Sequence, residues 1–404
     1  MGITHHQQVE KISNMFHDLK AQKTDPLLAL IGLFKSDQRT NKIDLGVGVY
    51  RDEDGLTPVL KAVKSAEQYL IENQTTKSYL GPLGNQAYTE HLAAIVFGKG
   101  FDSKEIFGIQ TVGGTGALRL GADLIKKAGP NTTVWLGNPS WVNHAPVFNA
   151  VSLEIKTYAY YKPQSQTINF EETVDAFEKA KRGDIMLLQG CCHNPTGVDL
   201  TLEQWKTLGS ICEKNGLIPF IDIAYQGLGK GLKEDREGVT LFMDMVPEAI
   251  VSVSCSKNFG LYRERTGALY VKANQSTLPN LSSSLMNITR PNYSMPPDHG
   301  AAIVETILSD AALTKEWHAE LTVMRNRINT TRRTLVENLH AKGVMMPAIQ
   351  EQYGMFSMLP LTAQQILTLR EDHAVYMADN GRINVAGLKS TDIPVLAKAL
   401  AKVV

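Results

Sequence analysis

Five short apolar runs recur along the chain, and each ends in a polar or glycine-rich turn. The runs cover residues 109–112, 133–136, 185–188, 217–221 and 249–253. Helical spacing of apolar positions separates several of them, and this alternation is typical of an α/β fold with a doubly wound, largely parallel sheet. Since such sheets bind ligands at the carboxyl ends of their strands, we expect the five turns to meet at one functional edge.

Other segments predict helices and one interrupted strand. An aspartate and a proline suit the start of a helix over residues 25–34, and further helices are predicted over 59–73 and 314–339. Residues 42–50 form a strand-like run with two glycines, which permit a ligand or another backbone to approach closely. Residues 1–24 are polar and weakly periodic, so we expect an arm there.

Composition excludes several classes of protein. A chain of 404 residues suggests two or three domains. Its 41 basic and 41 acidic residues balance, so no basic field exists to attract nucleic acid or an anionic membrane. No apolar run is long enough to span a bilayer, and no signal-peptide pattern begins the sequence. The four cysteines lack metal-ligand spacing, which predicts no metal site and a cytoplasmic location.

The first turn carries a candidate anion site. Gly113, Gly114 and Thr115 follow a strand and precede a helical pattern, where unpaired amides and the helix dipole favour an anion such as phosphate. The motif is neither GxGxxG nor GxxxxGK[ST], which argues against a dinucleotide or a nucleoside triphosphate. Alone, it indicates a phosphate site without identifying the ligand.

Three other turns carry residues that could take part in binding or catalysis. Each of these residues also has a purely structural explanation. Lys257 follows the fifth run, and Arg263 and Arg265 come soon after it. Cations and desolvation lower a lysine pKa and free its amine, although a solvated basic loop explains the same residues. Asp222 after the fourth run either pairs with a cation or caps a helix. Trp141 either stacks on a flat heterocycle or lies in a domain interface.

The turns are more informative as a set. They bring a phosphate cradle together with Trp141, Asn194, Asp222, Tyr225 and Lys257 at one edge of the expected sheet. A planar, phosphorylated cofactor that reacts with an amine accounts for every member of this set. Pyridoxal 5'-phosphate is such a cofactor.

Residues 254–267 closely resemble the cofactor-lysine motif of class I, fold-type I aminotransferases, in the aspartate and aromatic-amino-acid branch. The resemblance runs from about residue 25 to the C-terminus. It implies a large domain with a mostly parallel seven-stranded sheet flanked by helices, and a smaller α/β domain. Eight further motifs carry it: residues 44–50, 76–81, 113–118, 138–144, 191–197, 222–227, 290–297 and 381–387.

The resemblance implies three catalytic residues, Lys257, Asp222 and Tyr225. Lys257 would bind the cofactor covalently and then move the substrate proton. Asp222 would keep the pyridine nitrogen protonated, and Tyr225 and Asn194 would donate to the ring's phenolic oxygen. Trp141 matches the position that stacks on the ring.

Further roles follow from the same resemblance. The cofactor phosphate would lie among Gly113, Gly114, Thr115, Ser254 and Arg265, with Tyr79 reaching it from a second subunit. The substrate would contact Gly48, Trp141, Asn194, Arg290 and Arg382. Within that second set, Arg382 would bind the α-carboxylate as a bidentate pair, Gly48 would lie on a closing loop, and Arg290 would cross the dimer interface to a side-chain carboxylate.

The resemblance also implies a homodimer with shared active sites. Its expected parts are an N-terminal arm of residues 1–24, a large cofactor domain of residues 58–315, and a small domain of residues 25–57 and 316–404.

The expected reaction moves an amino group from an amino acid to 2-oxoglutarate by a ping-pong mechanism. Gln189, Ser78 and Met295 replace residues of the aspartate pattern, which favours aromatic donors (Phe, Tyr, Trp) alongside aspartate and glutamate. The alternative is an aspartate aminotransferase with little aromatic activity. A decarboxylase or lyase would gain little from clamping the α-carboxylate, and a non-catalytic cofactor-binding protein would not need Lys257, Asp222 and Tyr225 together.

Overall fold

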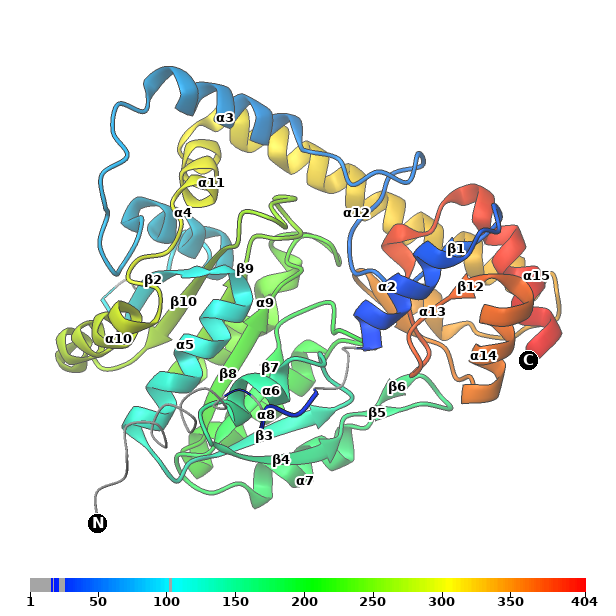
Figure 1. Ribbon diagram of the computed structural model, residues 1–404. Helices are drawn as coiled ribbons and strands as arrows, with labels where there is room; N and C mark the ends of the chain where they lie inside the picture. The colour runs from blue at the N-terminus through cyan, green and yellow to red at the C-terminus, as the bar shows by residue number, and fades with distance from the viewer. Residues whose placement is uncertain (1–15, 17, 22–25, 102–103) are drawn as a thin grey trace, which may run out of the picture.

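The computed structural model describes residues 16, 18–21, 26–101 and 104–404 (Figure 1). Most of the predicted arm, and the aspartate expected to cap the first helix, lie outside these residues. Within the described ranges, no helix combines the length and the apolar character needed to cross a membrane.

A seven-stranded sheet forms the centre of the larger part of the molecule, in the order β2-β10-β9-β8-β7-β3-β4. All neighbours are parallel except β10, which is antiparallel to both β2 and β9. The strands are β2 (Ile106–Val112), β3 (Thr133–Asn138), β4 (Glu154–Ala159), β7 (Ile185–Gln189), β8 (Ile218–Ile223), β9 (Ala249–Ser254) and β10 (Thr266–Lys272). The five predicted strands are present and point the same way, so the prediction that their turns share one edge is confirmed.

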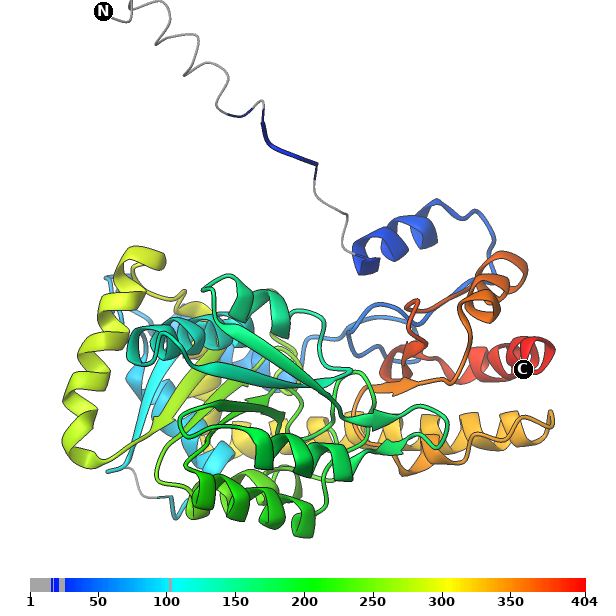
Figure 2. The same ribbon diagram turned by 90° about the horizontal axis from the view of Figure 1, so that it is seen from below.

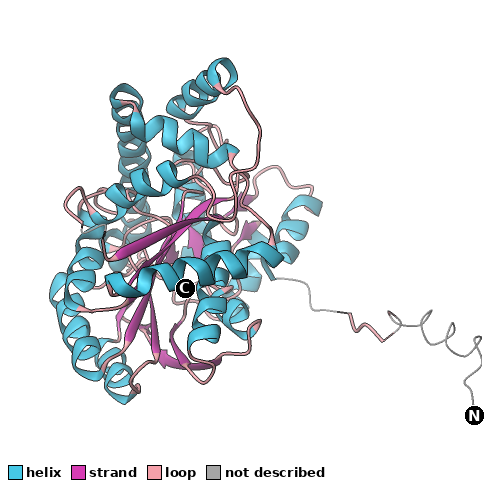
Figure 3. Cartoon of the chain, turned by 90° about the vertical axis from the view of Figure 1, so that its left-hand side faces the viewer, coloured by secondary structure: helices cyan, strands magenta, loops and turns pink. Residues whose placement is uncertain are grey.

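Helices cover both faces of this sheet, as Figures 2 and 3 show. Alternate strand residues face opposite sides: Phe220 packs in the core beneath α5, whereas Ile221 packs in the core on the other face with α8 and α9. These helices are α3 (Lys61–Asn73), α4 (Gln86–Phe97), α5 (Gly113–Ala128), α6 (His144–Asn149), α7 (Phe170–Lys179), α8 (Leu202–Asn215), α9 (Glu237–Met245), α10 (Leu278–Asn292) and α11 (His299–Ser309).

A second hydrophobic core lies in the part built mainly from the C-terminal segment. Two short sheets support it: β1 (Ile43–Asp44) is parallel to β12 (Val375–Tyr376), and β11 (Phe356–Met358) is antiparallel to β13 (Arg382–Asn384). A further hairpin of β5 (Tyr161–Lys162) and β6 (Thr167–Ile168) extends from the sheet part. The remaining helices here are α2 (Pro26–Ser36), α13 (Ala348–Glu351), α14 (Ala363–His373) and α15 (Ile393–Val403).

Helix α12 (Ala311–His340) joins the two parts (Figure 1). Trp317 and Leu321 belong to the core of the sheet part, whereas Leu335 and Leu339 belong to the second core. The helices predicted over 59–73 and 314–339 are therefore found with ends shifted by a few residues. The strand-like run over 42–50 contains only the two-residue strand β1, because its glycines lie in a loop.

Candidate active site

Lys257 lies just beyond β9, at the edge where the five turns meet. Its side chain is half-buried, and its Nζ atom lies 4.8 Å from the centre of the Tyr225 ring. Burial lowers the pKa of this amine from 10.5 to about 8, with Asp222 opposing the change and Arg265 adding to it. The lowered pKa makes the free amine available near neutral pH, as a nucleophile or base requires.

Asp222 lies near the end of β8 and is almost completely buried. Its Oδ1 accepts a hydrogen bond of 2.8 Å from the Ser252 hydroxyl, and its Oδ2 lies 3.0 Å from His144 Nε2. His144 Nδ1 in turn lies 2.8 Å from Ser140 Oγ. Within the described part of the chain this carboxylate therefore contacts Ser252 and His144, and the sequence analysis assigned no role to His144. In the sequence, the only indication of a role for His144 was its position in the motif over residues 138–144, which also contains Trp141.

Tyr225, Asn194 and Arg382 form a continuous group beside Lys257. Asn194 Nδ2 lies 3.2 Å from the Tyr225 hydroxyl, and Arg382 Nη1 donates over 3.5 Å to Asn194 Oδ1. Burial raises the pKa of Tyr225, so its phenol keeps the proton that it would donate to a ligand. These contacts bring together the predicted donors to a ring oxygen and the predicted carboxylate ligand.

Arg382 is a buried cation, with 8% of its surface exposed, and it lacks a carboxylate partner within the described part of the chain. Its Nη2 donates to the Gly46 carbonyl at 2.8 Å, but its Nε has no hydrogen-bond partner there. The guanidinium carbon lies 4.6 Å from the centre of the Phe356 ring. Because a buried, uncompensated charge is costly, this arrangement suits a carboxylate supplied by a ligand.

The loop containing Gly48 passes close to the same group. A Cβ atom at Gly48 would lie 3.1 Å from the Phe356 ring, so the absence of a side chain allows this approach. Asn384 Nδ2 donates to the carbonyls of Val47 and Val49 at 2.6 and 2.7 Å. These bonds fix the loop next to strand β13, which carries Arg382.

The predicted phosphate cradle is assembled at the start of α5. Gly113 has φ +66°, and a Cβ there would lie 2.6 Å from Arg265 Nη2; one at Gly114 would lie 2.9 Å from Ser254 Cβ. Thr115 follows on the first helical turn, where backbone amides lack intrahelical partners. A helix N-terminus, a hydroxyl and a guanidinium thus converge, and these groups fit a phosphate.

Trp141 stands at the side of a cleft of about 850 Å³, which Asn194 and Arg382 also line. The indole is half-buried and meets the His144 ring edge-on, with centroids 5.3 Å apart and planes at 87°. The cleft has an apolar wall from α2, formed by Leu27, Leu28, Leu30 and Leu33. Such a wall favours the apolar part of a ligand.

Two predicted site residues, Tyr79 and Arg290, do not contact the residues around Lys257 in their own chain. Tyr79 is 93% exposed in the loop after α3. Arg290 is exposed on α10, and its Nη1 donates to Ser294 Oγ over 2.5 Å. Their expected place in a neighbouring subunit's site stays a prediction.

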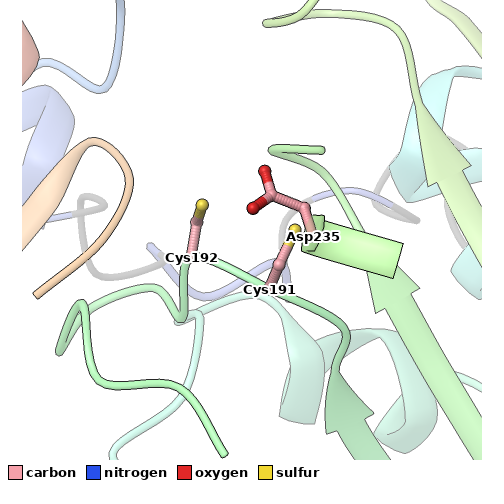
Figure 4. Close-up of side chains that lie close together, drawn as sticks. All are labelled: Cys191, Cys192 and Asp235. Atoms are coloured by element: carbon pink, nitrogen blue, oxygen red, sulfur yellow. The ribbon is translucent and has the colours of Figure 1, made fainter. Parts of the chain in front are cut away.

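A separate cluster resembles a metal site in composition (Figure 4). Ligand atoms of Cys191, Cys192 and Asp235 lie within 4.8 Å of one another, and all three residues are buried. Although a hydrogen bond from Cys192 lowers it, burial raises the net pKa of Cys191 to about 11, which disfavours the thiolate that binds metals. The Asp235 carboxylate already accepts backbone hydrogen bonds from residues 227, 229, 230 and 231. The cluster therefore stabilises a loop, and the absence of a metal site stays a prediction.

Comparison with known proteins places this geometry in a family. A family model described as "Aminotransferase class I and II" matches residues 40–400. The chain is 48% identical over 384 residues to the tyrosine aminotransferase of Rhizobium meliloti (strain 1021), covering 95% of this chain and 98% of that protein. It is 47% identical over 395 residues to the aspartate aminotransferase of Escherichia coli (strain K12), covering 96% and 100%.

A solved structure agrees with this result. The aromatic-amino-acid aminotransferase from Burkholderia pseudomallei, covalently bound to pyridoxal phosphate, is 38% identical to this chain and superposes with a TM-score of 0.94. The match covers 96% of this chain and 99% of that one. The chain belongs to the class I and II aminotransferases.

Proposed function

We propose that this aminotransferase prefers aromatic amino acids as donors, also accepts aspartate and glutamate, and passes the amino group to 2-oxoglutarate. The observation that carries the proposal is the buried Arg382 beside a cleft with an apolar wall from α2. A substrate with a carboxylate at one end and an aromatic ring at the other complements both features. The names of the relatives, tyrosine and aspartate aminotransferase, support both donor classes.

The cofactor is pyridoxal 5'-phosphate, which supplies an aldehyde for amine attachment and a protonated ring that withdraws electrons. The start of α5, Ser254 and Arg265 would hold its phosphate. Asp222 would hold a proton at the ring nitrogen, since its carboxylate is buried and forms no ion pair with a lysine or arginine within the described residues. Tyr225 and Asn194 would donate to the ring oxygen, and Trp141 would cover one face of the ring.

Lys257 is the proposed acid and base for the substrate. With its pKa lowered to about 8, its amine would take a proton from the substrate Cα and deliver it to the C4′ carbon of the cofactor. Arg382 would fix the α-carboxylate and so orient the Cα–H bond toward this amine. A substrate side chain against the apolar wall of α2 would displace water from the cleft.

The proposed assembly is a cytoplasmic homodimer with shared active sites. Exposed Tyr79 and Arg290 support it, since both fit the motif but have no role in their own chain's site. The large domain would cover residues 58–315, and the small domain residues 25–57 and 316–404, with α12 contributing to both cores.

Single half-reactions test the donor preference. Phenylalanine and aspartate are added separately to the protein carrying its cofactor, and the loss of the cofactor's visible absorbance is followed. A higher rate per unit concentration with phenylalanine is expected. Conversion by aspartate alone would overturn the aromatic preference and leave an aspartate aminotransferase, the second candidate supported by the relative from Escherichia coli.

A further inference from the structure

Gln189 makes a two-point contact with the backbone of Asn194. Its Nε2 donates to the Asn194 carbonyl and its Oε1 accepts from the Asn194 N–H, both at 2.8 Å. These paired bonds resemble those between neighbouring strands and fix both polar groups of one residue. Asn194 itself contacts Tyr225 and Arg382, so its position sets the donors around the cofactor and the substrate.

The contact also determines which way the Gln189 amide points. Only Oε1 can accept from the Asn194 N–H, so the other amide atom is the NH₂ group, which has two hydrogens to donate. One is donated to the Asn194 carbonyl, and the other is available to Ser140 Oγ, which lies 3.4 Å from Nε2, at the long end of hydrogen-bond distances. Gln189 is therefore a donor toward Ser140.

The direction of this bond then determines which atoms donate in the hydrogen bonds of Ser140 and His144. With its oxygen accepting from Gln189, the Ser140 hydroxyl can donate to His144 Nδ1, 2.8 Å away. His144 Nε2 then carries the proton that it donates to the Asp222 carboxylate at 3.0 Å. Gln189 is also the residue of β7 that pairs with Asp222 of β8. The series of hydrogen bonds therefore begins and ends at two residues that are neighbours in the sheet.

We propose that Gln189 is a positioning residue with two roles: it fixes Asn194, and it orients the hydrogen bonds from Ser140 through His144 to Asp222. This inference rests on the proposed function. A glutamine is suited to it because its amide supplies one fixed donor group and one fixed acceptor without titrating. Asp222 thus accepts one imidazole N–H from His144 at Oδ2, while its Oδ1 accepts from the Ser252 hydroxyl.

Two variants separate the roles. Gln189→Leu removes both bonds to Asn194 and is expected to weaken pyridoxal phosphate binding by about tenfold, the loss that two buried hydrogen bonds imply. It also removes the donor to Ser140 Oγ without introducing a charge, so it tests the contact with Asn194 apart from the charge that the second variant adds. Gln189→Glu keeps the acceptor for the Asn194 N–H but replaces the NH₂ donor. The Ser140 hydroxyl would then turn to the new carboxylate, and both nitrogens of His144 would become protonated.

The cofactor role is measured by titrating the apoprotein with pyridoxal phosphate and following fluorescence. The proton positions are measured from ¹⁵N shifts of labelled histidine in the apoprotein, with the His144 signal assigned from its loss in His144→Gln. The matched control is Gln166→Leu, which removes a different glutamine, one that is buried and donates to the Met358 carbonyl at 2.7 Å. It should lower thermal stability without changing cofactor affinity or the His144 signal.

The expected pattern is weaker cofactor binding in both Gln189 variants and a doubly protonated His144 only in Gln189→Glu. Unchanged affinity in Gln189→Leu would overturn the positioning of Asn194. An unchanged His144 signal in Gln189→Glu would overturn the directional role. The histidine measurement needs no cofactor, whereas failure of the wild-type protein to bind pyridoxal phosphate or convert any donor would instead overturn the proposed function.

Discussion

Replacing Lys257 with methionine should stabilise the apoprotein at neutral pH while abolishing turnover. The fold places this amine where burial lowers its pKa from 10.5 to about 8. At pH 7 the folded protein therefore holds a protonated amine in surroundings that disfavour its charge. Methionine has a similar length and no charge, so it should fill the space without that cost.

The size and sign of the effect follow from proton linkage. The difference between a pKa of 10.5 and one of about 8 corresponds to about 3 kcal/mol at pH 7. This figure is an upper value, because the side chain is only half-buried. Between about pH 8 and 10.5 the unfolded chain retains a proton that the folded chain has released, so wild-type stability rises with pH. The variant lacks this rise, and its advantage should fade toward pH 10.5.

Thermal unfolding of both apoproteins between pH 7 and 10.5 measures the difference. For a chain of this length, about 3 kcal/mol corresponds to a shift of about 3 °C in Tm. Protein concentration is held constant, since subunit association would also change Tm. Lys398→Met, at an exposed lysine on α15, controls for removing a positive charge. Parallel Tm profiles for Lys257→Met and wild type across this pH range would show that the fold does not disfavour the charged amine.

Two other substitutions test the substrate contacts and the scaffold. Arg290→Ala should reduce kcat/KM for aspartate by about 100-fold, because losing one partner of a charge pair has an effect of this size. The rate of the phenylalanine half-reaction should change by less than about threefold, since phenylalanine has no distal carboxylate. Equal losses with the two substrates would show that Arg290 does not bind the distal carboxylate. Arg332→Leu should destabilise the protein by about 3 kcal/mol, because buried Arg332 donates to four backbone carbonyls and to Ser357. The exposed Arg333→Leu is the control in thermal unfolding, and an equal effect of the two substitutions would contradict this role.

The apolar runs predicted the centre of the fold because buried parallel strands need apolar residues on both faces. Strands β4 and β10, which the apolar runs did not predict, lack such an apolar pattern. In β4, Glu154 and Thr157 are exposed, as befits an edge strand, and the apolar run of β10 directly follows the polar loop containing Arg265. The short strands β1 and β12 pair across more than 300 residues, a contact that no local pattern reveals.

Within the site, the sequence predicted groups that end a strand and missed those that act on them from elsewhere. Lys257 and Asp222 follow or end apolar runs, so their location was predictable. His144 begins a six-residue helix, and its contact with Asp222 depends on how that helix packs. Gln189 was noticed only as a departure from the family pattern, because its bonds to Asn194 depend on the turn that follows β7.

The charges of the site explain why it should bind two anionic groups at once. Lys257, Arg265 and Arg382 are three basic side chains in one region, and Asp222 is the carboxylate whose charge acts on the reactive amine. A phosphate of nearly two negative charges at Arg265, and a substrate carboxylate at Arg382, would compensate the two guanidinium groups. Lys257 would then remain beside Asp222 and the Tyr225 ring, where its lowered pKa gives a larger neutral fraction near pH 7 than an ordinary lysine has. The two guanidinium groups, which have no carboxylate partner within the described ranges, would therefore give the protein affinity for its anionic ligands and leave the Lys257 amine to move protons.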